Sequence, residues 1–161
     1  MEPTAPGEFA TTLGAWLAEA ARGDPHHRRF GATRHRYQLA PPLADARIAA
    51  IEATIGGRLP DAYRRFVAEV GHHGAGPFHG LWPLDHPLQL AHARAAFAPE
   101  RAGVALYRGV VGLGHVGCGQ IALLIVAGDH RGQVWIDARA GGGGVRAVAP
   151  DFDAYYLAWI Q

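Results

Sequence analysis

Apolar residues recur at helical spacing through the first half of the chain. Residues 8–22 place their apolar side chains on one side of a helix, which Gly23-Asp24-Pro25 ends. Two further stripes, over 44–55 and 60–70, predict a pair of short amphipathic helices joined by a Gly-Gly turn. We therefore expect a helical first half, in which Phe66 is a core residue of the second short helix.

The ends of these two helices can be placed from single residues. Gly56 suits the left-handed geometry that often caps a helix, because it has no Cβ to clash. Pro60 is expected as the first residue of the next helix, where its missing N–H costs no hydrogen bond. Asp61 then lies in the first turn, where the helix dipole favours a carboxylate, and Gly71 closes the helix.

From Gly109 onward the pattern becomes extended. The near-continuous apolar run at 121–127 is typical of a strand buried on both faces. Further strands are expected at 110–113, at 133–137 and, as an edge strand, at 145–148, with GHVGCGQ (114–120), 128–132 and 141–144 as turns.

The remaining segments complete an α+β prediction. Asp151 is a favourable N-cap for a C-terminal helix whose aromatic stripe must dock on the core. Residues 71–84 are expected to form a glycine-rich loop whose apolar side chains fold down onto the protein. The alanine-rich stretch 88–97 is expected to form a short helix. We expect N-terminal helices packed on a curved, mainly antiparallel sheet, closed by the aromatic helix.

The run YQLAPPLADARIAAIEATIGGRLPDAYRRFVAEVGHHGAGPFHGLWPL resembles the front half of the SUKH superfamily. The order and spacing of Gly56, Leu59-Pro60, Tyr63 and Phe66, Gly71, and Gly76 with Gly80-Leu81 carry the resemblance. A second block, GCGQIALLIVAGDHRGQVWIDARAGGGGVRAV, is similar to the same family at the glycines around Cys118, the Gly-x-Val-Trp and Asp137. The chain is thus identified as one SUKH-like domain over 1–161, with a helical extension at 1–29 and a family-like core at 30–160.

The resemblance implies protein binding, not catalysis. The superfamily contains yeast cell-wall-assembly regulators and bacterial immunity proteins that neutralise secreted toxins. It implies an immunity protein with a toxin as its partner, or alternatively a regulatory or scaffold domain without a toxin. Many inhibitors of basic nuclease toxins are strongly acidic, whereas this chain has a net charge of +1, which argues against that class of target.

The net charge and the composition argue against several other classes of function and location. A net charge of +1 argues against a large nucleic-acid footprint, and no run approaches the ~20 apolar residues of a membrane span. The start, MEPTAPGEF, lacks the blocks of a signal peptide, and the single Cys118 cannot form an internal disulfide. We therefore expect a cytoplasmic protein without a cofactor.

The only basic cluster is HHRRFGATRHR, residues 26–36. Its four arginines and three histidines surround one aromatic residue, Phe30. One interpretation is an anion or RNA contact. The other, which we favour, is a solvated connector, because the cluster is short and has little aromatic interleaving.

Nucleophilic catalysis and metal binding are the two kinds of chemistry that the sequence offers, and each has a structural alternative. Cys118 with His115 could act as a nucleophile and base, but no helix N-terminus follows the cysteine to lower its pKa, so a structural cysteine is favoured. Residues 72–92 hold a group of histidines that could bind zinc. His72 and His73 are adjacent and converge poorly, and metal-binding motifs are absent from the sequence, so we expect no metal site.

The partner is expected on a concave sheet face or its rim, where exposed aromatic residues and arginines act as hot spots. The candidate protein-binding residues are Phe78, His79, Trp82, Arg131 and Asp137. For each of them, core or turn packing is the alternative that we favour. No catalytic residues are assigned.

Overall fold

The computed structural model describes residues 7–84 and 93–161. Helices α1 (Glu8–Gly23) and α2 (Ala32–His35) precede the helix pair α3 (Asp45–Ile55) and α4 (Asp61–Glu69). The second half contains η1 (Gly103–Tyr107), β1 (Val110–Gly117), β2 (Gln120–Ile125), β3 (Val134–Asp137), η2 (Arg139–Gly141), β4 (Val145–Ala149) and α6 (Phe152–Ile160). The predicted α+β class is confirmed.

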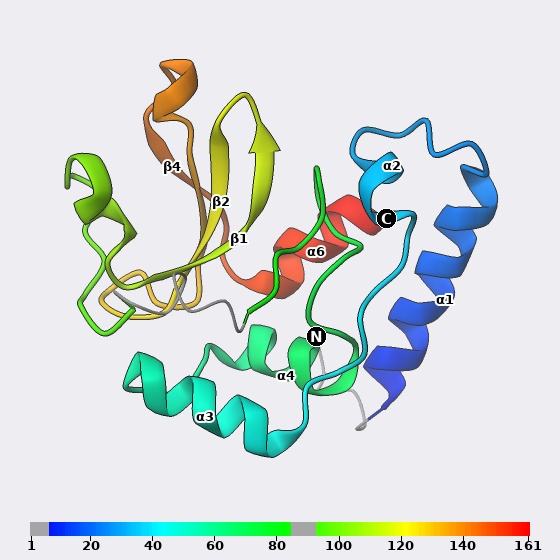
Figure 1. The fold of residues 1–161 in the computed structure, drawn as a ribbon, viewed down its shortest axis with the longest axis horizontal. Helices are drawn as coiled ribbons and strands as arrows, with labels where there is room; N and C mark the ends of the chain where they lie inside the picture. Colours follow the sequence, from blue (N-terminus) through cyan, green and yellow to red (C-terminus); the bar gives the residue numbers. More distant parts are fainter. Residues whose placement is uncertain (1–6, 85–92) are drawn as a thin grey trace.

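The four strands form one open antiparallel sheet in chain order, β1-β2-β3-β4. The helix α6 crosses beside the sheet, with α3 and α4 below it and α1 and α2 on the far side (Figure 1). It contacts α1, α4 and β4, so it joins the helical half of the chain to the sheet. The C-terminal helix therefore closes the domain, as its aromatic stripe predicts.

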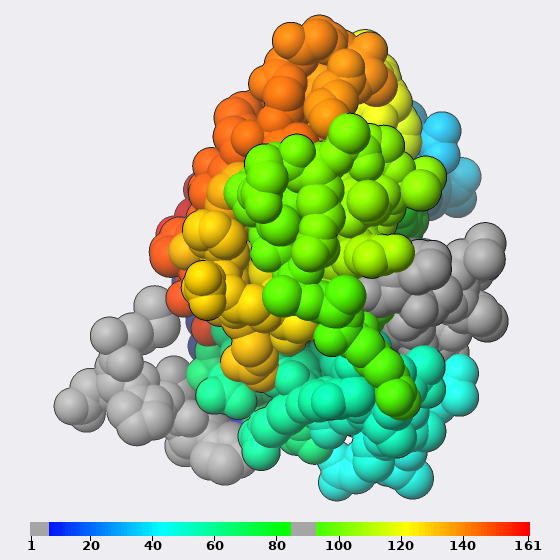
Figure 2. Space-filling view, turned by 90° about the vertical axis from the view of Figure 1, so that its left-hand side faces the viewer, coloured from blue at the N-terminus to red at the C-terminus, as the bar shows by residue number. Residues whose placement is uncertain are grey.

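Strand β2 is buried on both faces, as its apolar run predicts. Ala122 and Leu124 belong to the large core beneath the helices, whereas Leu123 and Ile125 belong to a smaller core on the other face. Successive side chains of a strand point to opposite faces, so one run supplies both cores. The smaller core also contains Leu106 of η1, which covers that face of the sheet (Figure 2).

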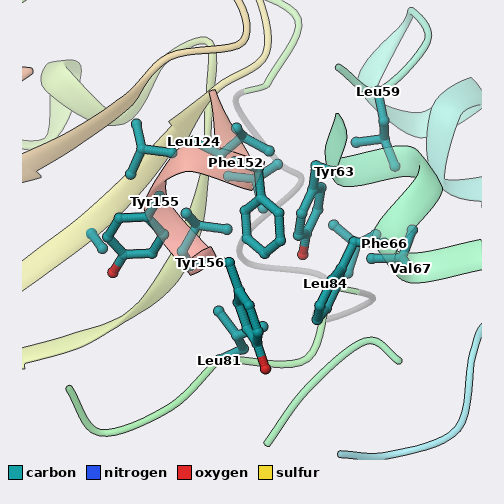
Figure 3. Packing of buried hydrophobic residues seen from close by; sticks show 14 of the residues in the cluster. Leu59, Tyr63, Phe66, Val67, Leu81, Leu84, Leu124, Phe152, Tyr155 and Tyr156 are labelled. Atoms are coloured by element: carbon teal, nitrogen blue, oxygen red, sulfur yellow. The ribbon is translucent and has the colours of Figure 1, made fainter. Parts of the chain in front are cut away.

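Aromatic rings of α4 and α6 form the centre of the large core (Figure 3). The ring of Phe152 lies 4.7 Å from that of Tyr63 and 4.9 Å from that of Phe66, centroid to centroid. Phe66 is fully buried, which agrees with the sequence-based expectation. Such edge-to-face pairs add about 0.5–1.5 kcal/mol each beyond the burial of their surface.

The predicted helix ends are largely confirmed. Gly56 caps α3 with φ of 77°, and the Asp151 carboxylate accepts a hydrogen bond from the Ala154 backbone N–H at 2.8 Å. Helix α4 begins at Asp61, one residue after the expected Pro60, which serves as its cap. These local signals fix where the helices α3, α4 and α6 begin and end.

Two sequence predictions differ from the structure or lie partly outside it. Strand β1 extends to Gly117, where a turn was expected from 114, because the tight turn at Cys118 and Gly119 lets His115 and Gly117 pair with β2. The helix expected over 88–97 falls partly on 85–92, outside the described residues, and its described part, 93–97, is not helical.

Candidate functional site

An open hollow of about 660 Å³ lies beside the C-terminal half of α6. We call it the aromatic groove. It draws on four parts of the chain: the α1–α2 connection, the loop after α4, strand β1 and helix α6. Its lining residues are Arg29, Phe30, Pro77, Phe78, Val116, Tyr155, Ala158 and Trp159. Because aromatic and apolar side chains dominate this lining, the groove suits a partner's apolar side chain.

Phe30 is the most exposed aromatic contact in the groove, with 63% of its surface accessible. Its ring meets the Phe78 ring edge-on, at 6.5 Å and 81°, and lies 4.8 Å from the His79 ring. Burying a large aromatic side chain against a partner is a common source of binding energy. Its position at the surface of an apolar hollow therefore makes Phe30 the leading candidate anchor.

A buried carboxylate fixes the backbone just before Phe30. Asp24 accepts hydrogen bonds from the backbone N–H groups of Arg28 at 2.7 Å and Arg29 at 3.0 Å, and from the Tyr37 hydroxyl at 2.8 Å. Burial alone would raise the pKa of Asp24, but these hydrogen bonds outweigh it and lower the pKa. The same burial and hydrogen bond raise the pKa of Tyr37 to about 12. The Asp24 carboxylate thus accepts three hydrogen bonds, two from backbone donors and one from a tyrosine.

The loop after α4 packs closely against the α1–α2 connection, with the backbones of the two segments in contact. Gly31 has φ of 81°, and a Cβ at this position would lie 1.5 Å from the Phe78 carbonyl oxygen. Phe78 itself has φ of 57°, a conformation that is strained for a bulky residue. Only glycine fits at position 31, so this contact positions Phe30 and Phe78 before any partner arrives.

Four arginines of the basic cluster extend into solvent, and one of them, Arg29, lines the groove. Arg28, Arg29, Arg34 and Arg36 are exposed, and their side chains make no hydrogen bond or ion pair within residues 7–84 and 93–161. Asp24, the acid closest to Arg28 and Arg29 in sequence, already accepts three hydrogen bonds. The basic cluster therefore presents unpaired positive charge beside an apolar hollow.

Two histidines lie behind Phe30. The rings of His79 and His115 are 5.6 Å apart, and the backbone N–H of His79 donates to the His115 carbonyl oxygen at 3.3 Å. Desolvation lowers the pKa of His79, and the positive charge of Arg34 and the presence of His115 lower it further. A neutral His79 can therefore support the Phe30 ring as a partly apolar surface.

A second polar cluster lies beside η1, two strands away from Val116 at the same end of the sheet, because Asp137 pairs with Ile121 and Ile121 with His115. Asp137 accepts hydrogen bonds from the Tyr107 hydroxyl at 2.7 Å and from Arg139 Nε at 2.8 Å. Arg139 also donates to the Gly103 carbonyl oxygen at 3.2 Å, which ties η1 to the end of β3. Hydrogen bonds from Arg139, opposed by desolvation, lower the pKa of Asp137 to about 2. We call this cluster the carboxylate clamp.

The structure separates the five residues predicted to bind a partner. Phe78 lines the aromatic groove and His79 lies against Phe30. Trp82 is half-buried, outside the groove lining, and its backbone N–H donates to Leu113 on the edge of β1. Arg131 is exposed on the β2–β3 turn and donates to the Arg58 carbonyl oxygen at 2.8 Å, while Asp137 is buried in the clamp.

Sequence reasoning did not place Phe30, Arg29 or Trp159 in a site. Phe30 and Arg29 belong to the basic cluster that we interpreted as a connector, and Trp159 was assigned only to the docking stripe of α6. The available signal was a single aromatic residue among charged ones at 26–36. Its meaning depends on α6 lying beside that segment, which local patterns do not show.

The sequence-based candidates for chemistry have these positions. Cys118 is exposed in the β1–β2 turn with φ of 49°, so it is not the buried packing residue that a structural cysteine suggests. It makes no hydrogen bond to His115 within the described chain. Among residues 7–84 and 93–161, no three His, Cys, Asp or Glu side chains are grouped to hold a metal ion. His86 and His92 lie outside the described residues.

Comparison with known proteins gives one match. The model of the SMI1 / KNR4 family (SUKH-1) matches residues 42–158, which excludes α1, α2 and the basic cluster. No curated protein and no solved structure matches the chain. Separately, no helix in the described parts of the chain has the length and apolar character needed to cross a membrane.

Proposed function

Because the chain belongs to the SMI1 / KNR4 family (SUKH-1), we propose that it is a non-catalytic immunity protein that binds and neutralises a toxin. Its site of action under this proposal is the cytoplasm of the cell that it protects. The aromatic groove is the proposed contact surface, with Phe30 and Phe78 as apolar anchors and Arg29 on its rim. Of the sequence-based candidates, Phe78 and His79 keep this role, and Trp82, Arg131 and Asp137 do not.

The observation that carries the proposal is the exposure of Phe30 at an apolar hollow beside Arg29, whose side chain has no hydrogen bond or ion pair within residues 7–84 and 93–161. Tyr, Trp, Phe and Arg are enriched at the centres of protein interfaces, where a partner removes them from water. A side chain needed for folding would be buried or paired. Phe30 is largely exposed, and the side chain of Arg29 makes no hydrogen bond or ion pair within the described residues, so both are available to a partner.

The non-catalytic part of the proposal rests on the position of the single thiol. A nucleophilic cysteine needs a base within hydrogen-bond reach, and Cys118 turns outward at the tip of a hairpin. The aromatic groove is lined mainly by carbon atoms of side chains, with Arg29 as its charged group. Such a lining suits recognition of a side chain better than activation of a substrate bond.

Co-expression with the product of the neighbouring open reading frame tests the proposal. We expect the protein to restore growth to cells that produce this toxin candidate and to co-purify with it. The Phe30→Ala variant should lose both effects while retaining its melting temperature, because Phe30 is largely exposed. If wild-type protein neither rescues growth nor co-purifies with the neighbour, the immunity function is wrong for that pair.

A further inference from the structure

We infer that the aromatic groove takes an acidic segment of a protein partner, in which one large apolar side chain enters the hollow and flanking carboxylates meet Arg29 and Arg34. This inference rests on the proposed function, because it names the chemistry of the partner at the same surface. Three features carry it: the shape of the hollow, the charge around it and the rigidity of its walls.

The hollow suits one anchoring side chain. Its volume of about 660 Å³ lies in the range of small-molecule pockets, roughly 300–1,000 Å³. The rings of Phe30, Phe78 and Trp159 line it, so an aromatic or branched aliphatic side chain would exchange water for carbon contacts on several sides. Burial of such an anchor in a pocket is how most interfaces concentrate their binding energy.

The charge around the hollow is positive. Arg29 lines the groove, and the backbone N–H of Arg34 donates to the carbonyl oxygen of Gly31, next to Phe30, at 2.9 Å. Glu19 lines the neighbouring hollow together with Arg29, without a hydrogen bond or ion pair between them in the described chain. Carboxylates of a partner can form bidentate hydrogen bonds with such free guanidinium groups, so the groove favours an acidic segment.

The backbone segments that line the groove are held in place before a partner binds. Asp24 holds the backbone of Arg28 and Arg29, and Gly31 packs on the Phe78 carbonyl oxygen. A preorganised surface loses little conformational entropy when it binds, which strengthens binding by a given contact area. The segment that supplies Arg29, Phe30 and Gly31 lies outside residues 42–158, so partner specificity would reside outside the family-matched core.

The observations favour a peptide over nucleic acid. Single strands bind along flat aromatic platforms, whereas Phe30 and Phe78 meet edge-on at 81°. The net charge of +1 also provides few of the phosphate contacts that nucleic-acid affinity needs. A localised patch of arginines around one apolar hollow matches a short acidic segment better than an extended polyanion.

Selection of random peptides displayed on phage, with the whole purified chain as bait, tests the inference. We expect the enriched peptides to share a large apolar residue flanked by Asp or Glu. The most enriched peptide is then synthesised with a fluorophore, and its affinity is measured by polarisation. Phe30→Ala and Arg29→Glu should each weaken binding about tenfold or more, because each removes one half of the recognition.

Two controls make the result specific. Arg146→Glu, on the exposed edge strand β4, makes the same charge change away from the groove and should alter affinity less than about twofold. A peptide in which one Glu is replaced by Lys should bind the Arg29→Glu variant better than the parent peptide does. This reciprocal rescue identifies a direct charge contact, and thermal melts of each variant check that it is folded.

Other outcomes would overturn the inference. These are enriched peptides without acidic residues, no enrichment at all, affinity unchanged in Arg29→Glu, or an oligouridylate RNA that displaces the peptide and binds more tightly. A concentration-dependent dimer abolished by Arg29→Glu would assign the groove to a second copy instead. Toxin neutralisation that survives Arg29→Glu contradicts this inference alone, whereas acidic-peptide binding without any toxin rescue contradicts the immunity function alone.

Discussion

The aromatic groove and the carboxylate clamp use the same residue types in opposite ways. In the clamp, the Arg139 guanidinium lies 5.9 Å from the Tyr107 ring and donates hydrogen bonds to Asp137. In the groove, Arg29 adjoins Phe30, and its side chain has no hydrogen-bond partner within the described residues. An arginine whose donors are satisfied within the chain stabilises the fold, whereas one left free beside an exposed ring is available to a partner.

The two aspartates show how the difference arises. Asp137 accepts hydrogen bonds from the side chain of Arg139, so the charge of Arg139 is paired within the carboxylate clamp. Asp24 receives the backbone N–H groups of Arg28 and Arg29, so the charged ends of these side chains remain in solvent. One carboxylate neutralises an arginine, and the other positions arginines without neutralising them. This contrast can be tested through stability and binding, which should respond to different substitutions.

The largest effect is expected in the large core, against which the groove residues Phe78, Val116 and Trp159 pack. Phe66→Ala should lower the free energy of unfolding by about 3–5 kcal/mol, because it removes a fully buried ring packed on Phe152 and Tyr156. Urea denaturation followed by tryptophan fluorescence measures this loss. A change below about 1 kcal/mol would show that the ring is not in the packed core that supports α6 and the groove.

In the clamp, Asp137→Asn should lower stability by about 1.5–3 kcal/mol, because it removes the charge that Arg139 pairs with. It should leave binding at the groove unchanged. The folded pKa of Asp137, about 2, lies below its usual 3.8, so the unfolded chain binds protons first on acidification. Wild-type stability should therefore fall as pH drops from about 4 toward about 2, and this part of the fall should vanish in the variant. Equal pH dependence in both proteins would contradict the clamp.

At the groove wall, Gly31→Ala should lower stability by about 1–3 kcal/mol, because its Cβ would clash with the Phe78 carbonyl oxygen. Binding should weaken as well, since relief of the clash moves Phe30 away from Phe78. Gly142→Ala is the matched control: Gly142 has a similar φ of 76°, but a Cβ there meets no atom within 4 Å. It should cost only the backbone strain of about 1–2 kcal/mol and leave binding unchanged. A Gly31→Ala variant as stable as the control would show that the loop and Phe30 are not locked together.

The smallest stability effect concerns His35, which is buried and meets the rings of both Tyr37 and Trp159 edge-on. Its Nδ1 accepts the Tyr37 backbone N–H at 3.0 Å, which requires an unprotonated nitrogen. Burial, and to a lesser degree His27, lower the pKa of His35 from 6.5, so the unfolded state takes up a proton first on acidification.

Stability should therefore decline as pH falls below about 6.5, toward the lower folded pKa. His35→Asn keeps an acceptor near the Tyr37 N–H and removes the titration, so its stability should depend less on pH in this range. Urea midpoints measured from neutral to mildly acidic pH compare the two proteins. An unchanged slope in the variant would show that His35 is protonated as easily in the folded state as in the unfolded one.

Local sequence signals predicted the elements but not the groove. The apolar run of β2, the Gly56 cap and the Asp151 cap each act within a few residues, so their consequences can be read from the sequence. The exposure of Phe30 depends on the contact between Gly31 and Phe78 and on the position of α6 beside this segment. Both involve segments that are distant in the sequence.

Residue type alone could also not separate the candidates for the site. Arg131 and Asp137 have the chemistry of interface residues, and the structure uses both in internal hydrogen bonds. Arg29 has the same chemistry and keeps its side chain in solvent, because only its backbone N–H is held by Asp24. All arginines offer the same donors, so tertiary contacts decide which of them form hydrogen bonds within the protein.

The most direct test combines Arg29→Glu with Phe30→Ala and measures affinity for the partner that co-purifies with the wild-type chain. We expect the double variant to keep its free energy of unfolding within about 0.5 kcal/mol of wild type, because both side chains are exposed. Partner affinity should fall by about a hundredfold, since the apolar anchor and the charge contact are both lost. Wild-type affinity in a fully folded double variant would contradict the assignment of the aromatic groove as the binding surface.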